Sequence, residues 1–126
     1  SYLFLFSMVS SMFKIYGIKN CSSMKKAFDA LTAQTLSYEF HDYKKLGIDE
    51  NTLRTWLKEI GKETVLNKKG TTWRKLTEQE QQHALSSDDA LIEILIQHTS
   101  LIKRPILHTD QGYIVGFDAD AYSALK

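Results

Sequence analysis

The 126-residue chain has little cysteine and little proline, and its positive and negative charges nearly balance. It has a single Cys, so it can form neither an internal disulfide nor a thiolate metal cage, and we expect a reducing, cytoplasmic setting. Sixteen Lys and Arg residues balance fifteen Asp and Glu residues. A formal charge of +1 provides no broad positive field for nucleic acid or an anionic membrane, so any binding is expected to be local.

Long apolar runs are also missing. The most apolar stretch, residues 1–9, is far shorter than the ~20 residues that a membrane-spanning helix needs. It also lacks the basic segment that opens a secretory signal. We therefore expect residues 1–11 to be an extension from a misplaced start or an added segment, and residues 12–126 to form one domain of ordinary size.

Hydrophobic spacing predicts a strand, a helix and a second strand at the start of this domain. The first strand is expected at Phe13–Gly17. Four apolar residues at i, i+3, i+4 and i+7 predict a helix from about Cys21 to Ala33: Met24, Ala27, Phe28 and Leu31. Alternation of Tyr38 and Phe40 with polar neighbours predicts a strand ending near Asp42. A connection through a helix favours parallel pairing of the two strands.

Capping signals predict helices in the middle of the chain. Asp49 can open one helix, Thr77 and Glu80 form a capping box, and Ser87 opens an apolar helix that we expect to be well buried. Gly61 suits the left-handed residue that ends the first of these helices. The expected buried stripes are Leu53, Trp56, Leu57 and Ile60 in the first helix, and Leu91, Ile92, Ile94, Leu95 and Ile96 in the last.

The end of the chain predicts a hairpin of Ile106–Thr109 with residues 113–116, followed by a helix that Asp118 caps. The order of elements indicates an α/β thioredoxin-like fold, in which a four-stranded mixed sheet carries helices on both faces. The segment between the second strand and the hairpin is too long for a connecting loop. We expect it to form a helical insertion subdomain at about residues 48–100.

Cys21 is the residue best placed for chemistry, because it is expected at the start of the first helix. The unpaired N–H groups of the next three residues favour a thiolate there, and Lys19 and Lys25 add positive charge. Such surroundings lower the pKa of a Cys from ~8.5 toward ~3.5 to 7.5. The alternative is an inert buried thiol, since free Cys is among the most buried residue types.

Three blocks of the sequence resemble the ArsC and Spx family, and most closely its YffB-like branch. They are YGIKNCSSMKKA at 16–27, GTTWRKL at 70–76 and IKRPI at 102–106, and the resemblance runs from Met12 to the C-terminus. It implies a thioredoxin-like domain with a helical insertion, a catalytic Cys21, and a functional Arg104 followed by a cis proline at Pro105.

The relatives imply different functions. YffB-like proteins look like glutathione-dependent thiol reductases, ArsC enzymes reduce arsenate, and Spx proteins bind the α subunit of RNA polymerase. Spx-type proteins commonly carry a CxxC switch, whereas Met24 occupies the fourth position here. The arsenate reductases use three arginines, and only Arg104 matches, because Asn67 and Gly116 with Phe117 stand where the other two would be.

We therefore expect a glutathione-dependent monothiol oxidoreductase in which Cys21 and Arg104 are catalytic. A single thiol cannot complete exchange alone, so glutathione is expected as co-substrate, with no bound cofactor. The expected partners are a disulfide or oxidised thiol substrate, with glutaredoxin as a further candidate. The remaining expected substrate or glutathione site is Asn20, Lys25, Lys69, Arg74 and Pro105. The four histidines lack ligand spacing, so no metal is expected.

Two other functions stay open. One is a non-enzymatic, Spx-like regulator that docks on RNA polymerase. The other is a weak arsenate reductase in which Lys68, Lys69 or Arg74 partly replaces the missing arginines. The alternative for these three cations, and for Arg104, is that they are ordinary charged residues of the surface without a role in binding. Trp73 is expected to pack in the core.

Overall fold

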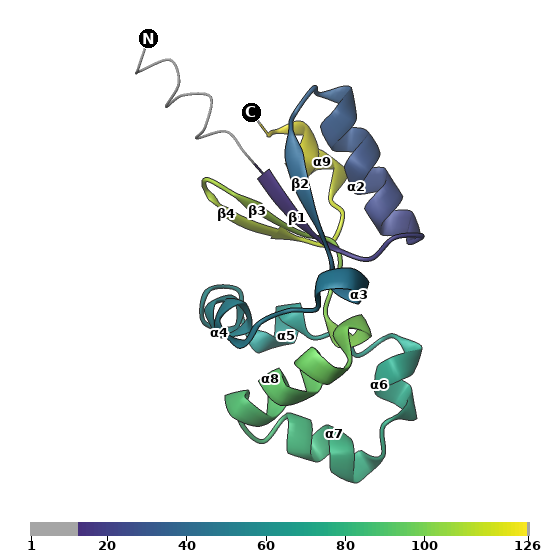
Figure 1. Ribbon diagram of the computed structural model, residues 1–126, viewed down its shortest axis with the longest axis vertical. Helices are drawn as coiled ribbons and strands as arrows, with labels where there is room; N and C mark the ends of the chain where they lie inside the picture. The colour runs from purple at the N-terminus through teal and green to yellow at the C-terminus, as the bar shows by residue number, and fades with distance from the viewer. Residues whose placement is uncertain (1–12, 126) are drawn as a thin grey trace. The chain divides into compact units, whose positions relative to one another are not determined.

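The computed structural model describes residues 13–125, which divide into two compact units (Figure 1). We call residues 13–42 together with 104–125 the sheet unit, and Tyr43–Lys103 the helical unit. The extension expected over residues 1–11 lies outside the described residues. The helical unit starts and ends a few residues outside the range 48–100 expected for the insertion.

The sheet unit is built on four strands in the order β2-β1-β3-β4. β1 (Phe13–Gly17) pairs in parallel with β2 (Tyr38–Asp42) and antiparallel with β3 (Ile106–Thr109). β4 (Gly112–Val115) pairs antiparallel with β3 and starts one residue earlier than predicted, because Gly112 pairs with Thr109. The helix α2 (Ser22–Ala33) makes the connection that the parallel pair requires. This is the mixed sheet that the sequence predicted.

The core of the sheet unit lies on one face of the sheet. α2 and α9 (Ala119–Ser123) contact each other and pack over this face, as Figure 1 shows. The buried cluster comprises Phe13, Ile15, Met24, Ala27, Leu31, Leu107 and Tyr122. The sequence predicted helices on both faces, whereas within this unit both helices share one face. The reason is that the apolar stripe of α2 and the ring of Tyr122 meet the same inward strand residues.

The helical unit contains six α-helices and a 3-10 turn among its described residues. Three of the predicted caps are present: the Asp49 carboxylate accepts from the Thr52 N–H at 3.1 Å, Ser87 accepts from the Ala90 N–H at 3.1 Å, and the Thr77 capping box is complete. The elements are α3 (Tyr43–Leu46), α4 (Glu50–Glu59), α5 (Lys62–Val65), α6 (Thr71–Lys75), α7 (Glu78–Ala84), α8 (Asp88–Gln97) and η1 (Thr99–Leu101).

The core of the helical unit forms where α8 packs against α4 and α7. Its fully buried side chains include Leu53, Trp56, Leu91, Leu95, Leu101 and Ile102. Two details differ from the prediction: Leu57, Ile60 and Ile94 are only half-buried, and Ile96 of α8 is 41% exposed. α8 is therefore buried along part of its circumference, because both helices that it contacts leave one side uncovered. No helix in residues 13–125 has both the length and the apolar character needed to cross a bilayer.

Candidate functional site

Cys21 stands between the end of β1 and the first turn of α2. Its backbone is extended, with φ −116° and ψ 133°, which is the conformation of a helix N-cap residue. The preceding Asn20 has a positive φ of 61°, a conformation that Asn adopts more readily than most residues. This turn leads the chain from the strand into the helix and leaves the thiol partly exposed.

The electrostatic surroundings of Cys21 favour its thiolate. Burial raises the pKa of the thiol, but the Met24 N–H, the Arg104 side chain and the Ser23 N–H together outweigh burial, so the net pKa is lowered. The Cys21 side chain makes no cap hydrogen bond with the first turn of α2. The two N–H groups therefore act on the sulfur mainly through their partial positive charge. The direction of the pKa shift agrees with the prediction from sequence.

The positive charge that acts on Cys21 comes from Arg104, not from the lysines that the sequence suggested. Lys25 Nζ lies 2.9 Å from Asp29 Oδ2, so a carboxylate offsets its charge. Both side chains are exposed, and water and salt screen what remains. The spacing of Lys25 and Asp29, four residues apart on a helix, is the sequence signal that could have revealed this pair.

Arg104 and Pro105 lead into β3, and the peptide bond between them is cis, as predicted. Pro105 is buried, and its carbonyl accepts a hydrogen bond of 2.7 Å from the Gly116 N–H. This bond ties the start of β3 to the end of β4. Arg104 is partly buried and acts on the Cys21 sulfur through both a hydrogen bond and its charge. The fold thus brings the two predicted catalytic residues together.

A cleft of about 440 Å³ opens beside the thiol. Its lining residues all come from the loop before α2 and from α2 itself: Lys19, Asn20, Cys21, Ser22, Met24, Lys25, Phe28 and Asp29. A Cβ on Gly17 would overlap the thioether end of Met24, so the glycine lets Met24 pack closely under the end of β1. The sequence did not predict Phe28 or Asp29 as site residues, because Phe28 belongs to the apolar stripe of α2.

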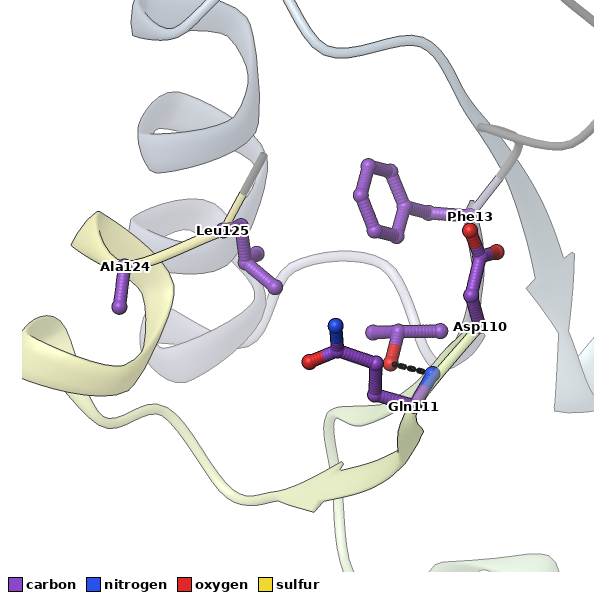
Figure 2. Close-up of a pocket in the computed structure, with 6 residues that line it drawn as sticks. Phe13, Asp110, Gln111, Ala124 and Leu125 are labelled. Atoms are coloured by element: carbon purple, nitrogen blue, oxygen red, sulfur yellow. Dashed lines mark hydrogen bonds between the residues drawn. The ribbon is translucent and has the colours of Figure 1, made fainter. Parts of the chain in front are cut away.

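A second hollow, of about 320 Å³, lies at the other end of β1. Figure 2 shows Phe13 and Leu125 on opposite sides of this hollow, with Asp110 beside Phe13 and Gln111 on the β3–β4 turn. The Gln111 N–H donates to Thr109 Oγ1 at 3.1 Å and holds this turn. None of its described lining residues is a thiol or a cation. The groups suited to thiol chemistry therefore gather at Cys21.

Lys69 and Arg74, the other predicted binding residues, belong to the helical unit and are tied into a loop there. The Lys69 N–H donates to Asn67 Oδ1 at 3.1 Å, and the Arg74 guanidinium donates to the Lys69 carbonyl. Trp73 between them is buried, in agreement with a packing role. A role for Lys69 and Arg74 in binding substrate stays a prediction.

Two of the four histidines make contacts with aromatic rings. The ring of His108 stacks on Tyr113 with centroids 4.5 Å apart, and His41 lies 4.9 Å from Tyr16 by the same measure. Within the described part of the chain, no group of three or more His, Cys, Asp and Glu residues could hold a metal ion.

Residues 16–125 match the family model described as the ArsC family. An uncharacterised protein of Haemophilus influenzae is 38% identical over 113 residues, covering 90% of this chain and 97% of its own. A solved structure described as YFFB protein is 45% identical, with a TM-score of 0.82 over 90% of this chain and 97% of its own. An arsenate reductase (ArsC) related protein from Brucella melitensis is 43% identical, with a TM-score of 0.71 over 91% and 94%. These similarities establish the thioredoxin-like fold.

Proposed function

The chain belongs to the ArsC family, and we propose that it is a glutathione-dependent monothiol oxidoreductase with Cys21 as its nucleophile. Family membership supports a thiol-based oxidoreductase at the level of the family. The observation that carries the finer proposal is the lowered pKa of Cys21, with Arg104 and two helix N–H groups acting on the only thiol of the chain. A partly exposed thiol in such electropositive surroundings is the usual setting of a reactive cysteine.

The first step is attack by the Cys21 thiolate on one sulfur of a substrate disulfide. A bond forms between Cys21 Sγ and that sulfur, the substrate S–S bond breaks, and the second substrate sulfur leaves as a thiolate that takes a proton from water. Arg104 stabilises the attacking thiolate, because its guanidinium supplies positive charge and a hydrogen bond at the sulfur. The product of this step is a mixed disulfide between Cys21 and half of the substrate.

An external thiol must resolve this intermediate because the chain has no second Cys. The glutathione thiolate attacks the substrate sulfur of the mixed disulfide and releases Cys21 as a thiolate. The lowered pKa of Cys21 makes it a good leaving group for this step. A second glutathione then frees the substrate thiol and forms oxidised glutathione. Two glutathione molecules thus supply the two electrons and two protons that the disulfide takes up.

The other proposed binding residues differ in how far their positions in the structure support a role. Asn20, with its positive φ, shapes the loop that presents Cys21, and Lys25 lies on the rim of the adjoining cleft. Pro105 lies next to Arg104 at the start of β3. Lys69 and Arg74 are proposed on the family resemblance alone. We further propose a cytoplasmic setting, where glutathione keeps thiols reduced, and glutaredoxin as an additional redox partner.

Arsenate is the weaker candidate substrate. Asn67 and Phe117 stand at two positions where the family resemblance expects arginines, and neither carries a charge. Both side chains already contact neighbouring residues. Asn67 Oδ1 accepts the Lys69 N–H, and the Phe117 ring lies 5.0 Å from the Tyr122 ring between centroids. One guanidinium provides a poor cage for a tetrahedral oxyanion, because charge-assisted hydrogen bonds are about twice as strong as neutral ones. We expect arsenate turnover to be slow or absent.

The experiment that tests the proposal measures a covalent adduct and turnover on the same sample. Oxidised glutathione should convert the protein to a mixed disulfide at Cys21, seen in the intact mass, and reduced glutathione should reverse it. Glutathione-dependent reduction of a small disulfide should accompany adduct formation. A protein that forms no adduct and shows no turnover would favour the non-enzymatic regulator, for which a pull-down with the RNA polymerase α subunit is the direct assay.

A further inference from the structure

The cleft beside Cys21 has an apolar base. Phe28 lines the cleft and is half-buried, so it supplies apolar surface there, whereas Met24, which also lines the cleft, is only 1% exposed. Apolar surface that faces solvent next to a reactive group favours a ligand group that removes it from water. The cleft is also larger than the few atoms around a disulfide need.

Phe28 is held in place by two aromatic neighbours from β2. Its ring stacks on Tyr38 with centroids 5.5 Å apart and meets the edge of Phe40 at 5.1 Å. Aromatic pairs in these geometries add to the stability of packing beyond the area that they bury. The apolar wall of the cleft is therefore a preformed surface, and binding against it requires little reordering.

The rim of the cleft carries an unbalanced positive charge. Lys25 pairs with Asp29 at 2.9 Å, so these two residues contribute no net charge. Lys19 is exposed and is the remaining charged residue among those that line the cleft, apart from the Cys21 thiolate, whose charge Arg104 offsets. An anionic group on a ligand would be attracted to this side of the opening.

We propose that this cleft selects the half of the substrate disulfide that becomes bonded to Cys21, favouring a thiol that carries an apolar side chain and a carboxylate. The inference rests on the proposed function and adds a substrate class to it. The apolar side chain packs on Phe28, and the carboxylate lies near Lys19. Glutathione has carboxylates but no apolar side chain, so it would leave the base of the cleft unfilled.

The test compares symmetrical disulfides of three tripeptides, so that either sulfur gives the same intermediate. The peptides are cysteinyl-leucyl-glutamate, cysteinyl-seryl-glutamate and cysteinyl-leucyl-lysine. Replacing leucine by serine should lower kcat/KM about tenfold, because partial burial of a leucine side chain is lost. Replacing glutamate by lysine should lower it about threefold at low salt, and the difference should shrink as salt is added.

A charge reversal at the rim assigns the second effect to Lys19. In Lys19→Glu, the preference between the glutamate and lysine peptides should reverse, while the preference for leucine over serine persists. Lys26→Glu is the matched control, because Lys26 is exposed on α2, changes the net charge equally and is not among the lining residues. The control should keep the preference of the parent protein.

A binding measurement separates failure of this inference from failure of the proposed function. Titrating Cys21→Ser with the leucine-glutamate disulfide should shift the Phe28 ring signals in NMR spectra, and the serine peptide should shift them less. Equal turnover of all three disulfides with no such shifts would overturn the proposed substrate selection by the cleft, while the proposed reductase activity would stand. No turnover of any disulfide, with selective shifts still present, would overturn the proposed reductase activity. The proposed ligand preference of the cleft would then stand.

Discussion

The first turns of α2 in the sheet unit and α7 in the helical unit differ in the atoms that face their free N–H groups. At α7, Thr77 Oγ1 accepts from the Glu80 N–H at 3.1 Å, and Glu80 Oε1 accepts from the Thr77 N–H at 2.8 Å. At α2, the N-cap residue is Cys21, whose side chain makes no cap hydrogen bond. The N–H groups of Ser23 and Met24 instead lower the pKa of the thiol.

This contrast separates a helix start that serves stability from one that serves reactivity. An oxygen cap typically stabilises a helix by about 1 kcal/mol, and Ser, Thr, Asp and Asn are the preferred residues. The N-cap residues of α4, α7, α8 and α9 are all of this kind, whereas the N-cap residue of α2 is Cys21. The positive end of α2 is thus left available to stabilise a thiolate, with Arg104 adding charge.

The largest expected effect is loss of activity in Cys21→Ser. Serine replaces the single thiol with a hydroxyl that cannot take part in disulfide exchange, and it gives α2 an ordinary oxygen cap. Glutathione-dependent disulfide reduction should therefore fall by about a thousandfold or more, to background. Thermal stability should stay the same or rise slightly, because Ser is a preferred N-cap residue. Activity assays and thermal melts on the same preparation check this. Substantial residual activity would show that the thiol is not the nucleophile.

Arg104→Gln should produce the next largest effect. Removing the guanidinium takes a charge and a hydrogen bond from the thiolate, so the pKa of Cys21 should rise toward that of a free thiol. Thiolate absorbance followed against pH measures this. Arg54→Gln in the helical unit is the matched control, because Arg54 pairs with Glu50 and Asp89 there. A similar rise in both variants would contradict a specific role for Arg104.

Asp49→Ala tests the other kind of helix start. The Asp49 carboxylate accepts from the Thr52 N–H and hydroxyl, so its removal should lower the free energy of unfolding by about 1 kcal/mol in urea melts. Cys21→Ala removes no cap bond, so it should cost clearly less in melts at a mildly acidic pH above about 4, where Asp49 keeps its charge and the thiolate fraction is smaller than at neutral pH. Equal losses for the two variants under these conditions would mean that Cys21 already acts as a structural cap.

The smallest effects concern the dependence of stability on pH. The folded pKa of Cys21 is lowered from 9.0. Its contribution to stability should therefore be fully present above about pH 9 and lost as pH falls through the folded pKa. The stability of the parent protein relative to Cys21→Ser should accordingly rise with pH in that window. A flat difference in urea melts would show that the fold does not favour the thiolate.

The carboxylate of Asp49 provides the acidic counterpart of this comparison. The hydrogen bonds from the Thr52 side chain and N–H lower the pKa of Asp49 below its ordinary value of 3.8. Its contribution is present above about pH 4 and is lost as pH falls through the lowered pKa. The stability difference between the parent protein and Asp49→Ala should therefore shrink in acid, and urea melts across that range measure it.

The sequence by itself determined the features that depend on residues close together along the chain. The caps at Asp49, Thr77 and Ser87 each use a side chain and an N–H three residues apart, so their patterns are legible without the fold. The bounds of β1 and β2 follow from alternation within single segments. The position of Cys21 at the N-terminus of α2 follows from the same local spacing.

Tertiary structure decided which distant groups meet and which side of each element is covered. Local spacing contains no information on the distance between Arg104 and Cys21, so only the family resemblance pointed to their pairing. The stripe of α2 marks Phe28 as apolar, but only the tertiary structure packs it against Tyr38 and Phe40 and leaves it half-buried among the residues that line the cleft. Ile96 fits the stripe of α8 equally well and is nevertheless exposed, because burial depends on the neighbours that the fold supplies.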